Sequence, residues 1–351
     1  MSSQPNEPTS PPEAAPVSSS PRDQLVPAND SASDASNGGD SSMGQDTASS
    51  TASVSSSILE YRRLQGRTYH SEKFESNYFL PNDDPLLESL DLTHHYLTIL
   101  LDEELFLAPI KEENLQRVLD VGTGTGIWAI EFADRYPSAE VIGTDLSPCQ
   151  PQWIPPNARF EIDDATLRWT WDPDSFNFIH IRYLFGAIQD WGGLFKEAFR
   201  CCAPGGWVQS TEANVEFRSD DGTVNLEPSL QMFTKLFQEG GKALGRPFFV
   251  HDLQEQGFRE AGFEDIQVID HKLPVSGWPK DPKLAQVGQF VRAALENDLE
   301  GLTLMMWHDL LQWPKEDYQL FLMGLRKGLH NPKVHSYMTV RYIYGRKPEI
   351  I

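Results

Sequence analysis

The stretch from Leu119 to Ile127 (LDVGTGTGI) constrains this chain most, because a short apolar β-like run leads straight into a glycine-rich turn and then into a helical pattern. Glycines let the backbone turn sharply and approach a ligand where a Cβ would collide. The first turn of the helix offers N–H groups that have no partner within the helix. This order therefore predicts a ligand-binding loop.

The spacing of that loop limits the kind of ligand. Gly122, Gly124 and Gly126 form a G-x-G-x-G pattern, with Asp120 two residues before the first glycine. The dinucleotide fingerprint is G-x-G-x-x-G, and the phosphate-binding Walker loop ends in G-K-S/T. Neither pattern is met, so the spacing argues against a nicotinamide-dependent oxidoreductase.

Acidic residues after two later β-like runs narrow the ligand further. Asp145 ends the run VIGTD, where a carboxylate can accept hydrogen bonds from both hydroxyls of a ribose. Asp163 or Asp164, in the sequence EIDDA, can accept from the exocyclic amine of adenine. These two are adjacent, so only one is expected to point into the site. No basic side chain in the turn is available for a pyrophosphate, which favours an adenosine ligand without one.

The centre of the chain alternates β-like runs with helical patterns. Because parallel strands need crossovers that cover both faces of their sheet, helices between five such runs predict a doubly wound α/β fold. Two further β-like runs follow, and the mostly helical region between them, about 278–330, is expected to form a lid. The seven runs are Arg117–Val121, Glu140–Thr144, Arg159–Ile162, Phe176–Ile181, Trp207–Thr211, Ile266–His271 and Tyr337–Tyr344.

The amino-terminal part divides into two segments. Residues 1–57 contain no Phe, Trp or Tyr, and 20 of them are Ser or Thr. Such a segment buries too little apolar area to offset its ordering entropy, so an acidic, disordered tail is expected, without an assigned function. Residues 58–115 are expected to form a helical cap, and residues 116–351 the ligand-binding domain.

Composition excludes several classes of function. Lys and Arg number 29 against 51 Asp and Glu, a net charge of −22, so direct nucleic-acid binding is not expected. Cys149, Cys201 and Cys202 form no C-x-x-C pair, and the nine histidines lack metal-ligand spacing. The first residues lack the basic and apolar regions of a secretory signal, and apolar runs are short. The sequence thus predicts a soluble, cytoplasmic protein without a metal or a membrane segment.

Many motifs after residue 57 match one known family. The chain resembles class I S-adenosylmethionine-dependent methyltransferases, and more closely the fungal LaeA-like group. The matching motifs are Gly66–His70, Leu80–Asp83, Leu90–His95, Ala108–Ile110, Val118–Ala129, Val141–Pro148, Phe160–Ala165, Phe178–Arg182, Asp190–Trp191, Pro204–Trp207 and Tyr344–Pro348. Asn177 departs from the aspartate common in the family before the fourth strand, and we expect it to affect packing rather than chemistry.

The resemblance implies a fold, a cofactor and a site. It implies a seven-stranded sheet, mostly parallel with one antiparallel strand, and S-adenosylmethionine as the cofactor. The three glycines would line the methionine and ribose portions, Asp145 the ribose hydroxyls, and Asp163 or Asp164 the adenine. The cofactor-binding residues expected from the resemblance are Asp120, Gly122, Thr123, Gly124, Thr125, Gly126, Asp145, Leu146, Asp163, Asp164 and Ala165.

Methyl transfer itself asks little of the protein, because the sulfonium already makes the methyl carbon electrophilic. Positioning the acceptor and excluding water supply much of the rate. At the end of the fourth β-like run, His180 is the candidate general base and Arg182 the candidate orienter of substrate or cofactor. The alternatives are a core histidine and an arginine that pairs with a carboxylate such as Asp190.

Two further groups of residues have both a structural and a ligand-binding interpretation. Histidine and tyrosine side chains of the cap either contact ligand or support the cap, and tryptophans either line an acceptor pocket or belong to the core. The former are Tyr69, His70, His94 and His95, and the latter are Trp191, Trp278, Trp307 and Trp313.

Two functions are compatible with these patterns. The first is methylation of a small-molecule acceptor, such as a fungal secondary metabolite, enclosed by the cap and the helical insert. The second is a LaeA-like regulator of secondary-metabolite gene clusters, acting in the nucleus with velvet-type protein partners. The tail is compatible with the second function. The lack of an import signal and of a basic surface favours the first.

Overall fold

The computed structural model describes residues 60–71 and 78–349. The segment 1–57, for which the sequence predicts a disordered tail, lies outside these residues. Among the described residues, no helix combines the length and apolar character needed to cross a bilayer.

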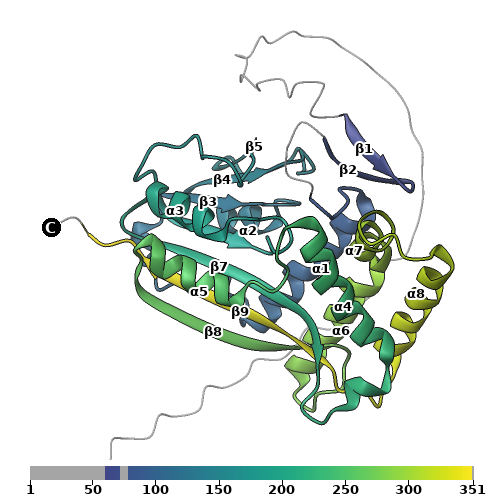
Figure 1. Ribbon diagram of the computed structural model, residues 1–351. Coiled ribbons are helices and arrows are strands. Elements are labelled where there is room, and N and C mark those ends of the chain that lie inside the picture. Colours follow the sequence, from purple (N-terminus) through teal and green to yellow (C-terminus); the bar gives the residue numbers. More distant parts are fainter. Residues whose placement is uncertain (1–59, 72–77, 350–351) are drawn as a thin grey trace, which may run out of the picture. The chain divides into compact units, whose positions relative to one another are not determined.

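A seven-stranded sheet forms the centre of the protein, in the order β5-β4-β3-β6-β7-β9-β8 (Figure 1). Neighbouring strands run parallel except on either side of β9, which is antiparallel to both β7 and β8. The predicted fold class is confirmed. The strands are β3 (Arg117–Val121), β4 (Glu140–Asp145), β5 (Ala158–Ile162), β6 (Phe176–Arg182), β7 (Cys202–Arg218), β8 (Glu264–Pro274) and β9 (Tyr337–Arg346).

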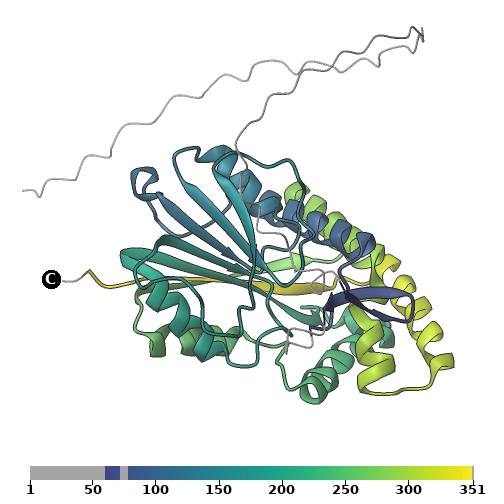
Figure 2. The same cartoon turned by 90° about the horizontal axis from the view of Figure 1, so that it is seen from above.

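Helices lie on both sides of this sheet (Figure 2). The helix α3 packs on α5, and α1 packs on α6. Because the central strand β3 is covered on both faces, its residues Val118 to Val121 are all buried, including the charged Asp120. The helices are α1 (Asp84–Leu100), α2 (Ile127–Arg135), α3 (Trp191–Cys201), α4 (Pro228–Leu244), α5 (His251–Ala261), α6 (Pro282–Asn297), α7 (Leu299–Leu304) and α8 (Lys315–His330).

The region 278–330 is helical, as the sequence predicts. It contains α6, α7, the π-helical turn η3 (Met305–Leu310) and α8, and Figure 1 shows these helices gathered with α1 and α4 at one end of the sheet. Their shared core includes Met306, Trp307, Leu322 and Leu325, all buried. Two short 3-10 turns are also present, η1 (Glu112–Asn114) and η2 (Thr223–Leu226). The lid function of the insert stays a prediction.

Two crossovers of the parallel sheet contain no helix. The connections from β4 to β5, residues 146–157, and from β5 to β6, residues 163–175, contain no helix. In the first, Pro148, Pro151, Pro155 and Pro156 remove backbone donors and prevent a helix from forming.

The cap is not helical throughout, contrary to the prediction for residues 58–115. The strands β1 (Tyr61–Leu64) and β2 (Arg67–Ser71) form an antiparallel hairpin before α1. Its turn residues Gln65 and Gly66 have φ of +49° and +85°, the left-handed pair that matches the twist of a two-residue hairpin. This Gln-Gly pair was the available sequence signal for the hairpin.

Candidate active site

The three glycines of the loop after β3 all have left-handed backbones. Gly122, Gly124 and Gly126 have φ of +69°, +59° and +81°. A Cβ on Gly122 would lie 2.4 Å from Leu184 Cδ2, and one on Gly126 would lie 2.5 Å from Phe160 Cζ. The first and third glycines are therefore required by close packing. A Cβ on Gly124 would meet, among the described residues, only Leu90 Cδ1 within 4 Å, at 3.4 Å. This glycine therefore borders open space.

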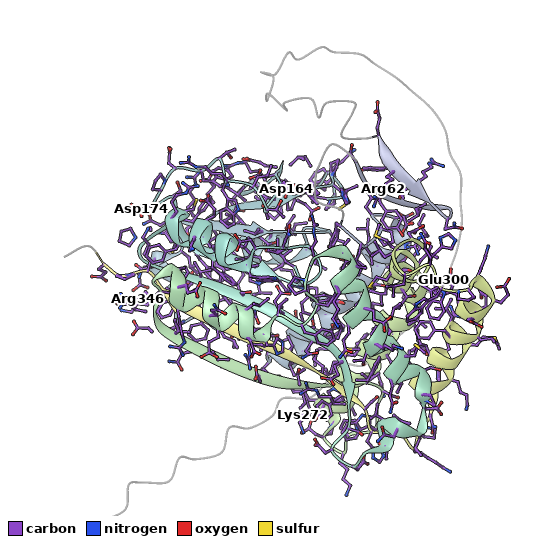
Figure 3. All side chains as sticks on the ribbon, viewed as in Figure 1. Arg62, Asp164, Asp174, Lys272, Glu300 and Arg346 are labelled. Carbon is purple, nitrogen blue, oxygen red and sulfur yellow. The ribbon has the colours of Figure 1, made fainter. Side chains whose placement is uncertain are left out.

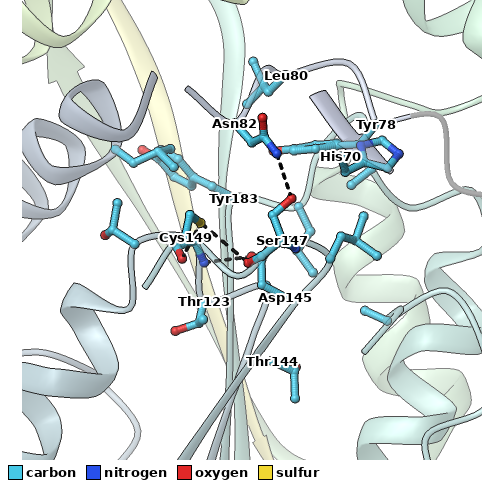
Figure 4. A pocket seen from close by; sticks show the side chains of 18 of the residues that line it. His70, Tyr78, Leu80, Asn82, Thr123, Thr144, Asp145, Ser147, Cys149 and Tyr183 are labelled. Atoms are coloured by element: carbon cyan, nitrogen blue, oxygen red, sulfur yellow. Dashed lines mark hydrogen bonds between the residues drawn. The ribbon is translucent and has the colours of Figure 1, made fainter. Parts of the chain in front are cut away.

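That open space is a pocket at the carboxyl edge of the sheet (Figure 4). Its empty volume is about 1150 Å³, part of which is open to solvent. Figure 3 shows Asp164, which lines it, well away from Asp174 and Arg346 at the opposite end of the strands. Of the sequence-predicted residues, those in the wall are Gly122, Thr123, Gly124, Thr125, Asp145, Leu146, Asp163, Asp164, Ala165 and Arg182.

Asp145 lies at the end of β4, beside the glycine loop. Its Oδ2 accepts a hydrogen bond from Gly124 N (2.8 Å), and its Oδ1 accepts one from Ser147 N (3.1 Å). Each carboxylate oxygen has a second lone pair for a ligand hydroxyl. Burial raises the pKa of Asp145 to about 6, although the backbone donors oppose this rise.

The two adjacent aspartates after β5 have different surroundings. Asp164 is buried, and its Oδ1 accepts hydrogen bonds from Thr166 N (2.9 Å) and Thr166 Oγ1 (2.6 Å). Among the described residues, the Asp163 carboxylate accepts one hydrogen bond, from Asp164 N to Oδ1 at 3.0 Å. Burial raises the pKa of Asp163. Asp164 thus closes the local turn, and Asp163 keeps an oxygen for a ligand in the pocket.

Three predicted residues lie behind the wall of this pocket, namely Asp120, Gly126 and His180. Asp120 Oδ2 accepts a hydrogen bond from Thr123 Oγ1 (2.6 Å), and its Oδ1 accepts one from His180 Nδ1 (2.7 Å). The His180 ring stacks on Trp128 with a centroid separation of 3.8 Å and is 1% exposed. Burial lowers the pKa of His180, against the opposing effect of Asp120.

The position of His180 bears on its predicted role. Its ring is held under the glycine loop and does not line the pocket. The role of general base stays a prediction. The observed contacts instead make His180 a support for Asp120 and, through Thr123, for the loop itself.

Arg182 follows on the same strand and does line the pocket. Its Nη1 lies 3.2 Å from His94 Nδ1, and His94 Nε2 in turn lies 3.0 Å from Glu131 Oε2. Within the described part of the chain, no carboxylate comes within 4.0 Å of the Arg182 guanidinium. Asp190, the partner considered from sequence, instead accepts a hydrogen bond from Gly193 N at the start of α3.

Residues of the cap form part of the pocket wall. His70 and Tyr78 point toward the pocket in Figure 4, and their rings lie 6.4 Å apart. Asn82 Nδ2 donates to Ser147 Oγ at 3.1 Å, which joins the cap to the loop after Asp145. Of the cap residues with two interpretations, Tyr69, His94 and His95 are not in the wall.

Many residues of the pocket wall were not predicted from the sequence, because most of them lie on helix faces and turns outside the glycine loop and the acidic strand ends. None of Trp191, Trp278, Trp307 and Trp313 lines this pocket. Over the residues that are described, no group of three or more His, Cys, Asp or Glu is arranged to hold a metal ion. The unanticipated wall residues include Tyr78, Leu86, Leu87, Leu90, Thr93, Ser147, Cys149, Tyr183, Leu184, Ala187 and Ile188.

Comparison with known proteins shows the family to which this chain belongs. The family described as "Methyltransferase domain" matches residues 92–268. The chain belongs to this family. The methyltransferase pytC of Aspergillus terreus is 35% identical over 86% of this chain and 93% of its own length. The chain is thus a class I S-adenosylmethionine-dependent methyltransferase of the fungal LaeA-like group, as the sequence motifs predicted.

Regulators are also among the relatives of this methyltransferase. The secondary metabolism regulator LAE1 of Cochliobolus heterostrophus is 34% identical over 81% of this chain and 94% of its own length. The protein-methionine methyltransferase laeA of Emericella nidulans is 31% identical over 82% of this chain and 77% of its own length. Enzyme and regulator names therefore occur at similar levels of identity.

Proposed function

We propose that this methyltransferase acts on a small, largely apolar acceptor enclosed between its cap and the turn after β6. The observation that carries the proposal is the apolar part of the pocket wall. It consists of apolar and aromatic side chains from α1, the cap and the turn after β6, and a wall of this kind suits an apolar acceptor. The side chains are Tyr78, Leu86, Leu87, Leu90, Tyr183 and Ile188.

The other half of the pocket fits S-adenosylmethionine. Gly124 leaves space next to the loop backbone, Asp145 has acceptors for two ribose hydroxyls, and Asp163 has one for the adenine amine. When bound, the cofactor supplies a sulfonium methyl group, whose S–C bond breaks as a lone pair of the acceptor forms the new bond. The part of the protein is to hold the acceptor in line and to exclude water.

The cofactor half is tested by calorimetric titration with S-adenosylmethionine and S-adenosylhomocysteine. Gly124→Asp is expected to abolish binding, because its carboxylate would enter the space beside Asp145. Gly245→Asp is the matched control. Gly245 has φ of +70°, similar to Gly124, but it ends α4 with no atom within 4 Å of a Cβ and lies outside the pocket wall. Equal affinities of the two variants would defeat the assignment.

Arg182 is proposed to bind an anionic group, either the carboxylate of the cofactor's methionine portion or an acidic oxygen of the acceptor. The support is its place in the wall without an ion-pair partner among the described side chains. If Arg182 holds the cofactor, Arg182→Gln weakens binding of S-adenosylhomocysteine but not of 5′-methylthioadenosine, which lacks the carboxylate. If it holds the acceptor, both affinities stay and the KM for the acceptor rises.

The two roles considered for His180 are separated by His180→Asn. The asparagine amide can donate to Asp120 from about the place of Nδ1, yet it cannot act as a base. We propose the supporting role, so turnover of a methyl-labelled cofactor is expected to survive in this variant. Loss of turnover with unchanged cofactor affinity would instead support the general base.

A second candidate is a nuclear regulator that acts with velvet-type protein partners. The 34% identity to LAE1 over nearly its whole length supports it. The test is complementation of a deletion strain with Gly124→Asp. Restored metabolite production by a variant that cannot bind cofactor would favour the regulatory role in a nuclear complex. Failure, together with a methylated small-molecule product from the parent enzyme, would favour the first proposal and a cytoplasmic site of action.

A further inference from the structure

The turn after β6 has a backbone that its sequence does not favour. Tyr183 has φ of +57°, a left-handed conformation that costs a residue with a side chain about 1–2 kcal/mol. Gly186 follows at +72°, and a Cβ there would lie 2.3 Å from Phe248 Cε1. Tyr183 and Leu184 both line the pocket. Other contacts must therefore hold this strained turn in place.

Backbone hydrogen bonds hold the two ends of this turn, from Tyr183 N to Thr211 O and from Gly186 N to Pro247 O, and one buried carboxyl group holds its middle. Glu212, on the neighbouring strand β7, is 0% exposed. Its Oε1 accepts a hydrogen bond from Leu184 N, and its Oε2 accepts one from Phe185 N, both at 3.0 Å. Each of these amides would cost about 1–3 kcal/mol if it were buried without an acceptor. A single side chain thus satisfies two successive amides of the turn.

The Tyr183–Gly186 turn contacts both sides of the pocket. The Tyr183 hydroxyl lies 3.1 Å from the Tyr96 hydroxyl on α1, which carries part of the acceptor-side wall. The Leu184 side chain packs against Gly122 of the cofactor loop. A shift of this turn would therefore change the distance between the two halves of the pocket.

We propose that Glu212 is a positioning residue for methyl transfer, which fixes the Tyr183–Gly186 turn so that acceptor and cofactor are held at reacting distance. Glu212 lies outside the pocket wall and acts through the two amides. The transfer readout below rests on the proposed function, whereas the exchange readout does not.

The first test measures hydrogen exchange of the Leu184 and Phe185 amides by mass spectrometry with single-residue fragmentation. In the parent protein these turn amides are expected to exchange as slowly as strand amides. In Glu212→Gln, whose amide nitrogen cannot accept, at least one should exchange about tenfold faster or more. Glu212→Asp keeps both acceptor oxygens on a shorter side chain and should give an intermediate rate.

Glu227→Gln is the matched control. Glu227, just before α4, is also buried, with 5% of its surface exposed. Its carboxylate accepts a hydrogen bond from Asn331 Nδ2, and it lies outside the pocket wall. Faster exchange at Leu184 and Phe185 in this control would overturn the proposal, because it would indicate general destabilisation. Fast exchange in the parent protein would overturn it as well, even if Glu212→Gln failed to fold.

The second test measures the reaction. S-adenosylhomocysteine affinity in Glu212→Gln should stay within about threefold of the parent value, because the cofactor contacts of β4 and β5 are untouched. Methyl transfer to the acceptor identified for the parent enzyme should lose about tenfold or more in kcat/KM, with partial rescue by Glu212→Asp. Unchanged kcat/KM alongside fast amide exchange would refute the positioning role. Absence of any transfer in the parent enzyme would instead refute the proposed function and leave the exchange result to decide the anchoring of the turn by Glu212.

Discussion

Asp145 combines the two properties that a pH-dependent cofactor site needs. Each of its carboxylate oxygens accepts one backbone amide and keeps a lone pair for a ligand, and burial raises its pKa to about 6. The ionised form accepts hydrogen bonds better and attracts the cationic sulfonium. The ionised fraction falls as the pH drops through 6.

We therefore expect S-adenosylmethionine affinity to be constant above about pH 7 and to fall below pH 6, by up to about tenfold per pH unit. Titration calorimetry from pH 5 to pH 8 measures this. Asp145→Asn should bind weakly and without that dependence. A flat profile in the parent protein would show that Asp145 does not control binding through its charge.

His180 illustrates how far single residues could be predicted. Its position at the carboxyl end of a central strand was correct, since it lies in β6. The direction of its side chain depends on Asp120 and Trp128, which lie on β3 and α2 and approach only in the folded protein. The linear sequence does not encode that approach as a motif.

The hairpin β1–β2 is attached to the rest of the protein by a partly buried ion-pair cluster. Arg67 Nε donates to Asp83 Oδ2 (2.6 Å), just before α1, and its Nη1 donates to Asp298 Oδ1 (2.8 Å), just before α7. Asp298 is 4% exposed and also accepts from Gly301 N. The hydrogen bond to Asp83 is the main cause that raises the Arg67 pKa, which keeps the guanidinium charged. One side chain thus connects the cap, α1 and the helical insert.

Arg67→Gln is expected to lower the free energy of unfolding by about 3 kcal/mol, because it leaves the Asp298 carboxylate buried without its cation. Urea denaturation measures the loss, and limited proteolysis should show earlier cleavage in residues 60–71. Arg346→Gln, which removes the more exposed pair with Asp265, should cost less than about 1 kcal/mol. Similar losses of unfolding free energy in the two variants would mean that the cluster around Arg67 stabilises the protein no more than a surface ion pair does.

Elements with a strong periodic pattern were predictable, and the short ones were not. All seven strands were anticipated near their observed places, because buried parallel strands carry dense apolar runs. The hairpin β1–β2 was missed, since its two short strands depend on a two-residue left-handed turn at Gln65 and Gly66. The connection after β4 contains no helix, because its prolines remove backbone donors.

The stability of the folded protein is expected to depend on pH through Glu212. Burial raises the pKa of Glu212 to about 8 from 4.5. A group whose pKa is raised on folding contributes stability that is fully present below its unfolded pKa and lost as the pH rises through its folded pKa. The Glu212 contribution should therefore decrease between about pH 4.5 and pH 8, by at most about 1.4 kcal/mol per pH unit.

The measurement is the free energy of unfolding in urea at pH 5, 6, 7 and 8 for the parent and for Glu212→Gln. Ionisable or charged groups near Glu212 in the described part of the chain include Tyr78, His251 and Arg341. They are common to both proteins, so the difference between the two curves isolates Glu212. We expect a steeper decrease with rising pH in the parent. Parallel curves would show that the pKa of Glu212 is close to 4.5 in the folded state.

The sequence by itself determined the features that are written in neighbouring residues. The strand, glycine turn and helix at Leu119–Ile127, the acidic residues at the ends of two strands, and the alternation of apolar runs were sufficient for the fold class and the family. These are short-range patterns, because backbone conformation and strand burial follow from local residue types.

The tertiary structure decided which side chains meet. It turned His180 toward Asp120 and away from the pocket, held Asp164 in a hydrogen-bonded turn with Thr166, and placed Glu212 against the amides of Leu184 and Phe185. Each of these outcomes depends on the packing of elements that lie far apart in the chain. A buried polar group takes its partner from whatever the fold brings within hydrogen-bonding distance, and that partner is not fixed by the residues beside it in sequence.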